Sequence, residues 1–162
     1  MLNKKIAMLG AAVAALASTG ANAATQTATA EVDIIAAVTL TQNVGLDLGT
    51  VASSAAAGTV TLPTGSNTRT CSASVTCVGT ATRGQFTVAG AATGFNVGIT
   101  VPASTSLTGA GAAMNLTLVP SITGFTSTGA AQVFYVGGTL TVGASQVAGT
   151  YTGTYNVSAD YQ

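Results

Sequence analysis

Few side chains in this sequence are suited to catalysis or metal binding. Its 162 residues include no histidine, four aspartates or glutamates and two cysteines. Without histidine there is no Ser-His or Cys-His nucleophile system and none of the common metal cages. Asp47 stands between Leu46 and Leu48, and we expect it to be a solvated strand residue and not a general acid. The composition therefore predicts a protein that is not an enzyme and that uses no cofactor and no metal.

The first 23 residues have the features of a secretory signal peptide. Lys4 and Lys5 precede the apolar run IAMLGAAVAALA, and Ala21 to Ala23 fit a cleavage site. The run is too short for the ~20 apolar residues that span a membrane. We therefore expect residues 1–23 to be removed on export and the mature chain not to insert into a membrane.

Charge is scarce in the mature chain that this cleavage would leave. Arg69 and Arg83 stand against four carboxylates, a formal charge of −2, so the chain has no electrostatic footprint for nucleic acid. The arginines could anchor an acidic partner or a sugar, but we expect them to solubilise strand ends. Glu31 and Asp33 could together bind a cation, or they form the polar outer face of a strand.

Export predicts a disulfide between the two cysteines, because an oxidising compartment favours this bond. On one straight strand Cys71 and Cys77 would lie about 20 Å apart, beyond bridging distance. A bridge therefore requires the chain to reverse at residues 72–74, which gives a hairpin closed by its own disulfide. A metal pair or a redox centre would need further ligands or a Cys-x-x-Cys spacing that the sequence lacks.

The mature chain is a succession of short strand-like runs separated by Gly, Ser, Asn and Pro. Turn signals recur roughly every 8–12 residues, which is typical of an all-β sandwich or barrel. No segment has a sustained helical period. Five aromatic residues fall inside apolar runs and are predicted to lie in the core: Phe86, Phe95, Phe125, Phe134 and Tyr135.

Both ends of the mature chain alternate between apolar and polar residues. Near the N-terminus one face holds Ala28, Ala30, Val32 and Ile34, and the other holds Thr27, Thr29, Glu31 and Asp33. This strand either belongs to the protein's own sandwich or inserts into a neighbouring subunit, where main-chain hydrogen bonds and alternate side chains would hold it. At the C-terminus one face holds Tyr151, Tyr155, Val157, Ala159 and Tyr161, which predicts a strand that runs to the end of the chain.

The two ends together resemble those of the chaperone–usher pilins. The C-terminal strand of these pilins typically has a glycine fourteen residues from the end and a penultimate tyrosine, and Gly149 and Tyr161 stand at those positions here. The phrases LDLGTV (46–51), GTVTL (58–62) and AGTYTGTYNV (148–157) are similar to secreted domains related to spore coat protein U and to a neighbouring bacterial family that lacks an assigned function. Those domains resemble pilin subunits of the archaic type.

This resemblance implies an immunoglobulin-like sandwich, residues 36–162, that lacks its last strand. Residues 24–35 would be a donor strand anchored by Ala28, Ala30, Val32 and Ile34 in the preceding subunit. The acceptor edge, also held by a periplasmic chaperone before an outer-membrane usher assembles the fibre, would be Gly149, Tyr151, Tyr155, Val157, Ala159 and Tyr161. The implied function is a structural and adhesive subunit of a cell-surface fibre. The alternative is a self-contained secreted sandwich that binds carbohydrate or another ligand.

Overall fold

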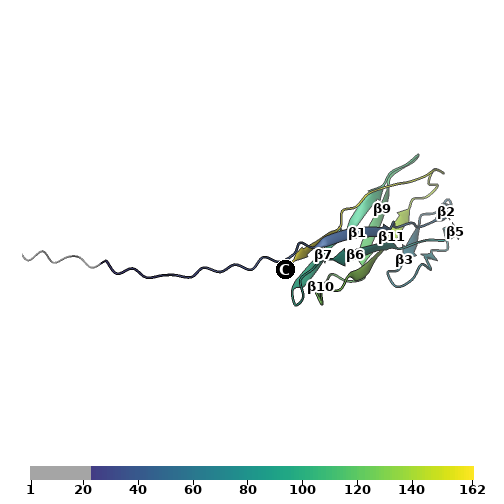
Figure 1. Ribbon diagram of the computed structural model, residues 1–162. Helices are drawn as coiled ribbons and strands as arrows, with labels where there is room; N and C mark the ends of the chain where they lie inside the picture. The colour runs from purple at the N-terminus through teal and green to yellow at the C-terminus, as the bar shows by residue number, and fades with distance from the viewer. Residues whose placement is uncertain (1–22) are drawn as a thin grey trace, which may run out of the picture. The chain divides into compact units, whose positions relative to one another are not determined.

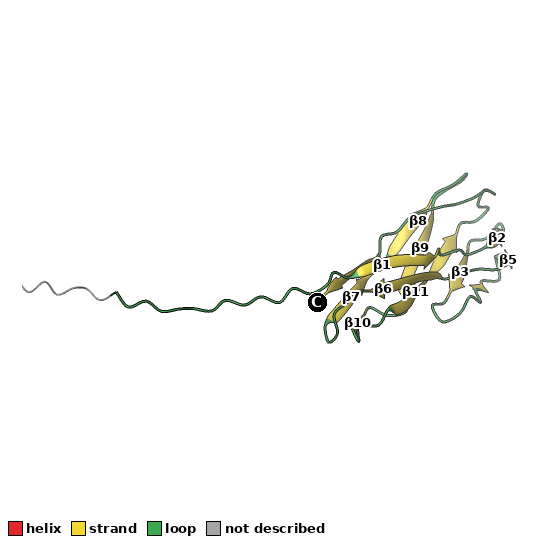
Figure 2. Cartoon of the chain, in the orientation of Figure 1, coloured by secondary structure: helices red, strands yellow, loops and turns green. Residues whose placement is uncertain are grey.

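The computed structural model describes residues 23–162, and that part of the chain holds twelve strands and no helix (Figures 1 and 2). None of these residues belongs to a helix long and apolar enough to cross a membrane. The predicted signal peptide lies outside the described residues except for Ala23. The chain divides into a segment that ends at Asp33 and a unit that runs from Ile34 to Gln162.

The segment that ends at Asp33 forms neither a helix nor a strand where it is described. Its side chains are exposed, and Val32 has 80% of its surface accessible. Residues 34–38, at the start of the second unit, also lie outside any strand, and Ile34 is 91% exposed. The predicted donor strand is thus not formed within the single chain, and its role remains a prediction.

The largest sheet is antiparallel and is built around one long strand. Its members are β1 (Thr39–Val44), β3 (Gly58–Leu62), β4 (Thr70–Cys71), β6 (Gly84–Ala89), β8 (Ser104–Leu107), β9 (Met114–Pro120) and β11 (Gln132–Val142). One edge of β11 pairs first with β6 and then with β3, and its other edge pairs with β9. Gly137 and Gly138 lie where the partner changes, and a side chain on either would collide with the backbone of a neighbouring strand.

Two smaller sheets complete the unit. In one, β7 (Asn96–Thr100) lies between β10 (Gly124–Thr126) and β12 (Ser158–Tyr161), and in the other β2 (Thr50–Ala52) pairs with β5 (Thr76–Val78). Buried residues from all of these layers meet in one core, among them Phe134 and Val60 of the large sheet, Val97 of β7 and Val75 beside β5. The predicted all-β sandwich is confirmed.

Strand alternation accounts for which side chains enter the core. In β9, Met114, Leu116 and Leu118 are buried, and the residues between them are exposed. Phe86 and Phe134 are buried and stack with ring centroids 5.3 Å apart. Phe95 differs from its prediction as a core residue, because it lies before β7 and 46% of its surface is accessible.

Candidate functional site

An open groove runs along the C-terminal segment of the sandwich. One wall is residues 46–53, the other is residues 146–155, and the hollow between them has a volume of about 880 Å³. The floor is the hydrophobic core itself, made of Met114 and Leu116 of β9 and Leu140 and Val142 of β11. Solvent therefore reaches buried core residues through an opening between two chain segments.

A second hollow, of about 460 Å³, continues the first. It lies between β1, where Leu40 and Gln42 line it, and residues 153–157. Leu46, Gly153 and Tyr155 line both hollows. We refer to the two together as the groove.

Only one edge of the C-terminal segment is paired. Thr152 exchanges two backbone hydrogen bonds with Thr108, at 2.8 and 2.9 Å, and β12 pairs with β7. Residues 153–157 make no backbone hydrogen bond to another strand within residues 23–162, although the Thr105 hydroxyl donates to the carbonyl of Thr154 at 2.7 Å. The groove thus borders residues 153–157, whose backbone pairs with no strand in the described chain.

The C-terminal strand is shorter than the sequence predicts. We expected one strand from Tyr151 to the end, but the paired parts are Thr152 and β12 alone. The gap in pairing lies opposite a break between two other strands of the same chain. β7 ends at Thr100 and β8 begins at Ser104, with Pro102 between them. Proline has no N–H to donate and interrupts a ladder.

The two faces of this segment are as the sequence predicts. Five apolar side chains are half-buried and pack against the core, and the polar residues that alternate with them are exposed: the packed ones are Tyr151, Tyr155, Val157, Ala159 and Tyr161. Gly149 opens the segment with φ +155°, and a side chain there would collide with Ala110. Tyr151 and Tyr155 line the groove, whereas Ala159 and Tyr161 lie beyond it.

One end of the groove is closed by hydrogen bonds between its walls. The Ser53 hydroxyl donates to the carbonyl of Gln146 at 2.9 Å, and the Ser145 N–H donates to the carbonyl of Ser54 at 2.7 Å. The Gln146 amide also donates to the Tyr151 hydroxyl at 2.9 Å, and that hydroxyl donates to the carbonyl of Val147. Nothing in the sequence indicated Gln146, because its role depends on where two distant loops meet.

Tyr155 carries an unpaired hydroxyl at the point where the two hollows join. Its ring packs edge-on against Phe86, 6.4 Å between centroids, and its oxygen is buried with no hydrogen-bond partner among the described residues. Burial raises the pKa of this hydroxyl above its ordinary value of 10.0.

This pKa shift predicts a loss of stability in alkali. The folded protein holds the Tyr155 proton more tightly than the unfolded chain does. The stabilisation from this proton is therefore complete below about pH 10, and it is lost as the pH rises through the pKa of Tyr155 in the folded protein. A Tyr155→Phe variant should lose less stability than the parent between neutral pH and pH 11. Urea unfolding at a series of pH values measures this, and an equal decline in both proteins would contradict it.

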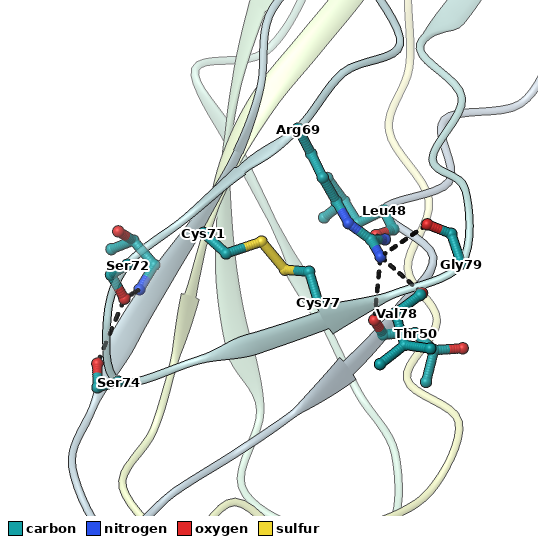
Figure 3. Close-up of a disulfide and its surroundings, with 10 residues drawn as sticks. Leu48, Thr50, Arg69, Cys71, Ser72, Ser74, Cys77, Val78 and Gly79 are labelled. Carbon is teal, nitrogen blue, oxygen red and sulfur yellow. Dashed lines mark hydrogen bonds between the residues drawn. A yellow bond between two sulfur atoms is a disulfide. The ribbon is translucent and has the colours of Figure 1, made fainter.

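A disulfide and an arginine hold the chain reversal next to the 46–53 wall (Figure 3). The two arms of this reversal do not form the predicted hairpin, because β4 pairs with β3 and β5 pairs with β2, in different sheets. Cys71 and Cys77 are bonded, with Cα atoms 6.4 Å apart, which confirms the predicted disulfide and chain reversal. The Arg69 guanidinium donates to the carbonyls of Leu48, Thr50, Val78 and Gly79. It thus ties β2 and β5 together where β2 forms part of the groove wall.

The expectation that both arginines solubilise strand ends is wrong. Each is half-buried, and Arg83 donates to the carbonyl of Thr64 while its guanidinium lies 3.6 Å from the centre of the Tyr135 ring. A guanidinium supplies several donors in a fixed plane, and this suits loops whose carbonyls lack strand partners. Both arginines are therefore structural.

Removal of the disulfide should weaken the sandwich measurably. The Cys71→Ser, Cys77→Ser double variant is expected to lose about 2 kcal/mol of unfolding free energy, because the short closed loop no longer restricts the unfolded chain. Urea unfolding measures the loss, and reduction of the parent protein should reproduce it. Equal stability of the parent and the variant would contradict a structural role for this bond.

The predicted donor residues are not part of a strand in the single chain. Ala28, Ala30, Val32 and Ile34 are all exposed and lie outside any strand, and Glu31 and Asp33 are exposed beside them. Asp47 is exposed, as expected, and its carboxylate accepts the N–H of Gly49 at 2.7 Å. No group of three His, Cys, Asp or Glu residues within residues 23–162 is placed to hold a metal ion.

These features define an all-β sandwich with an open groove beside its C-terminal segment. Residues 38–161 match a family described as a domain of unknown function, DUF4402, and the chain belongs to this family. The match starts one residue before β1 and ends with β12, so it covers the whole sandwich. No curated protein and no solved structure is significantly similar to the chain.

Proposed function

We propose that this protein is a subunit of a pilus-type surface fibre, in which the groove of one subunit takes residues 24–35 of another as an added strand. The observation that carries the proposal is the groove, because it has an apolar floor and borders residues 153–157, whose backbone pairs with no strand in the described chain. An incoming strand would bond to residues 153–157 and cover Leu116 and Leu140. This combines a main-chain ladder with apolar pockets, which is the usual chemistry of strand addition.

The N-terminal segment has the composition of such a strand. Its alternating face holds Ala28, Ala30, Val32 and Ile34, and the last two are 80% and 91% exposed in the single chain. Each of the larger side chains would contribute up to ~1.5–3 kcal/mol on full burial. The opposite face, with Glu31 and Asp33, would stay in water. We infer that the segment binds to a partner subunit and not to its own sandwich.

The position of the chain start determines which direction of the added strand gives an open fibre and which gives a closed pair. Ala36 lies next to Tyr161, so the N-terminal segment leaves the sandwich at the end where β12 finishes. If the added strand runs antiparallel to residues 149–157, the donor subunit lies at the opposite end of its acceptor and subunits repeat head to tail. A parallel strand would place two like ends together and allow mutual exchange, which closes a dimer.

The resemblance to chaperone–usher pilins supplies the rest of the proposal. The protein would be exported through the periplasm, a chaperone would cover the groove until assembly, and an usher in the outer membrane would catalyse polymerisation. Adhesion or biofilm formation would be the role of the finished fibre at the cell surface.

A second candidate follows from the size of the groove. A volume of about 880 Å³ lies within the range of small-molecule sites, and the floor is apolar. In this alternative the protein remains a monomer and binds a carbohydrate or another extracellular ligand. The experiment below separates the two.

Deletion of residues 24–35 tests the proposal directly. The shortened chain should fold, because residues 34–162 hold the sandwich and the removed residues form no strand. It can still accept a strand but has none to donate, so on mixing with full-length protein it should end fibres and shorten them in proportion to its amount. Electron microscopy measures the length. Failure of the shortened chain to fold, or fibres of unchanged length, would favour a self-contained sandwich.

A further inference from the structure

The hydroxyl of Tyr161 joins three segments that are far apart in the sequence. It accepts a hydrogen bond from the backbone N–H of Ala92 at 2.7 Å and donates one to the carbonyl of Ala36 at 2.9 Å. Ala92 lies in the turn between β6 and β7, and Ala36 lies just before β1. We refer to this pair of hydrogen bonds as the Tyr161 bridge.

Packing fixes the position of the bridging oxygen. The Tyr161 ring is half-buried against the core and meets Phe95 edge-on, with centroids 5.9 Å apart at 70°. Its backbone pairs with Val97 in β7, and the N–H of Gln162 donates to the carbonyl of Asn96 at 3.0 Å. The ring therefore presents its hydroxyl from a rigid strand.

Apart from this bridge, the chain before β1 is held by the side chain of Val38, which is half-buried and packs against the core. Strand pairing starts at Thr39, opposite Ala89. Within residues 34–38, the carbonyl of Ala36 is the one group with a hydrogen-bond partner in the described chain. The Tyr161 bridge thus restrains this part of the chain at a point three residues before the first strand pair.

We propose that Tyr161 is a positioning residue that fixes where the N-terminal segment leaves the sandwich, and that it thereby stiffens the joint between successive subunits. The second part rests on the proposed function. With residues 24–35 held in the neighbouring groove and Ala36 held by the bridge, no free residue separates the two subunits. Without the bridge, residues 36 and 37 become free, because Val38 is the first residue that packs against the core, and each adds two rotatable backbone torsions.

Backbone ¹⁵N relaxation of a single subunit tests the first part. The measurement uses full-length protein with Val32→Asp, which keeps Tyr161 and Ala36 intact and blocks polymerisation if the proposed function holds. Order parameters of residues 36 and 37 should be near 0.85, the value of rigid backbone, and when Tyr161→Phe is added to this variant they should fall below about 0.6. Tyr161→Phe keeps the ring against Phe95 and removes only the hydroxyl.

Tyr151→Phe is the matched control, because its hydroxyl bonds to Gln146 and Val147 at the other end of the segment. It should leave residues 36 and 37 rigid. The proposal is overturned if residues 36 and 37 are already mobile with Tyr161 in place, or if they remain rigid in Tyr161→Phe. The first of these results is measured with Tyr161 in place, so the proposal can be contradicted even if Tyr161→Phe does not fold.

Fibres of the otherwise unaltered chain test the second part. Tyr161→Phe fibres should have a shorter persistence length in electron micrographs than parent fibres, and equal stiffness would refute a role in the joint. If the parent forms no fibres, the proposed function and the joint both fail, whereas the relaxation result still decides whether Tyr161 fixes the start of the N-terminal segment.

Discussion

A Val32→Asp subunit is expected to fold as the parent does and to form no fibre. Val32 is 80% exposed in the single chain, so a carboxylate there disturbs no packing before assembly. In the assembled fibre the same carboxylate would lie in an apolar groove with no cationic partner, because neither Arg69 nor Arg83 lines the groove. An uncompensated buried charge costs about 3–5 kcal/mol, a loss of more than 100-fold in affinity for each joint.

Thr29→Asp is the matched control for this variant. It adds the same charge to the same segment, but on the face that alternates with the four anchors and is expected to stay in water. Size-exclusion chromatography and electron microscopy should show monomers for Val32→Asp and fibres for Thr29→Asp. Fibres from both variants would mean that the anchors do not enter the groove.

A synthetic peptide of residues 24–35 is expected to stabilise the subunit that lacks them. Its four anchors would cover the core residues that line the groove, and its backbone would pair with residues 153–157. A ligand that binds the folded state alone raises the unfolding free energy by about 4 kcal/mol at a concentration 1,000 times its dissociation constant. Thermal unfolding, followed by circular dichroism at increasing peptide concentration, measures the rise.

The control peptide carries serine in place of Val32 and Ile34, which keeps the length and the backbone donors but removes most of the apolar surface. It should stabilise the subunit far less. An unfolding temperature that does not respond to the parent peptide would show that the groove does not take this segment, and a screen of sugars on the same subunit would then test the second candidate.

Much of the fold could be predicted from residue patterns because each pattern has a local cause. The alternation in Met114–Pro120 sets which side chains enter the core, and the need to bridge Cys71 and Cys77 sets the reversal between them. Short strands were harder to predict. β8 (Ser104–Leu107) has no apolar run to mark it, and β10 (Gly124–Thr126) is only three residues long.

The site could be predicted only in part, for a physical reason. The faces of residues 151–162 follow from their alternation, so the packed tyrosines were found. The opposite wall, the core floor and the ties made by Arg69 and Gln146 depend on contacts between distant segments, and no local pattern reports these. The gap in the C-terminal strand likewise depends on the break between β7 and β8, which contains Pro102.

The most direct test of the account is electrophoresis in SDS, with and without boiling, of material sheared from cells that export this protein. Strands exchanged between subunits should resist SDS until heat unfolds the sandwich. The account predicts a ladder at multiples of the mature subunit mass that collapses to a single band on boiling. A single monomer band in both lanes would contradict it.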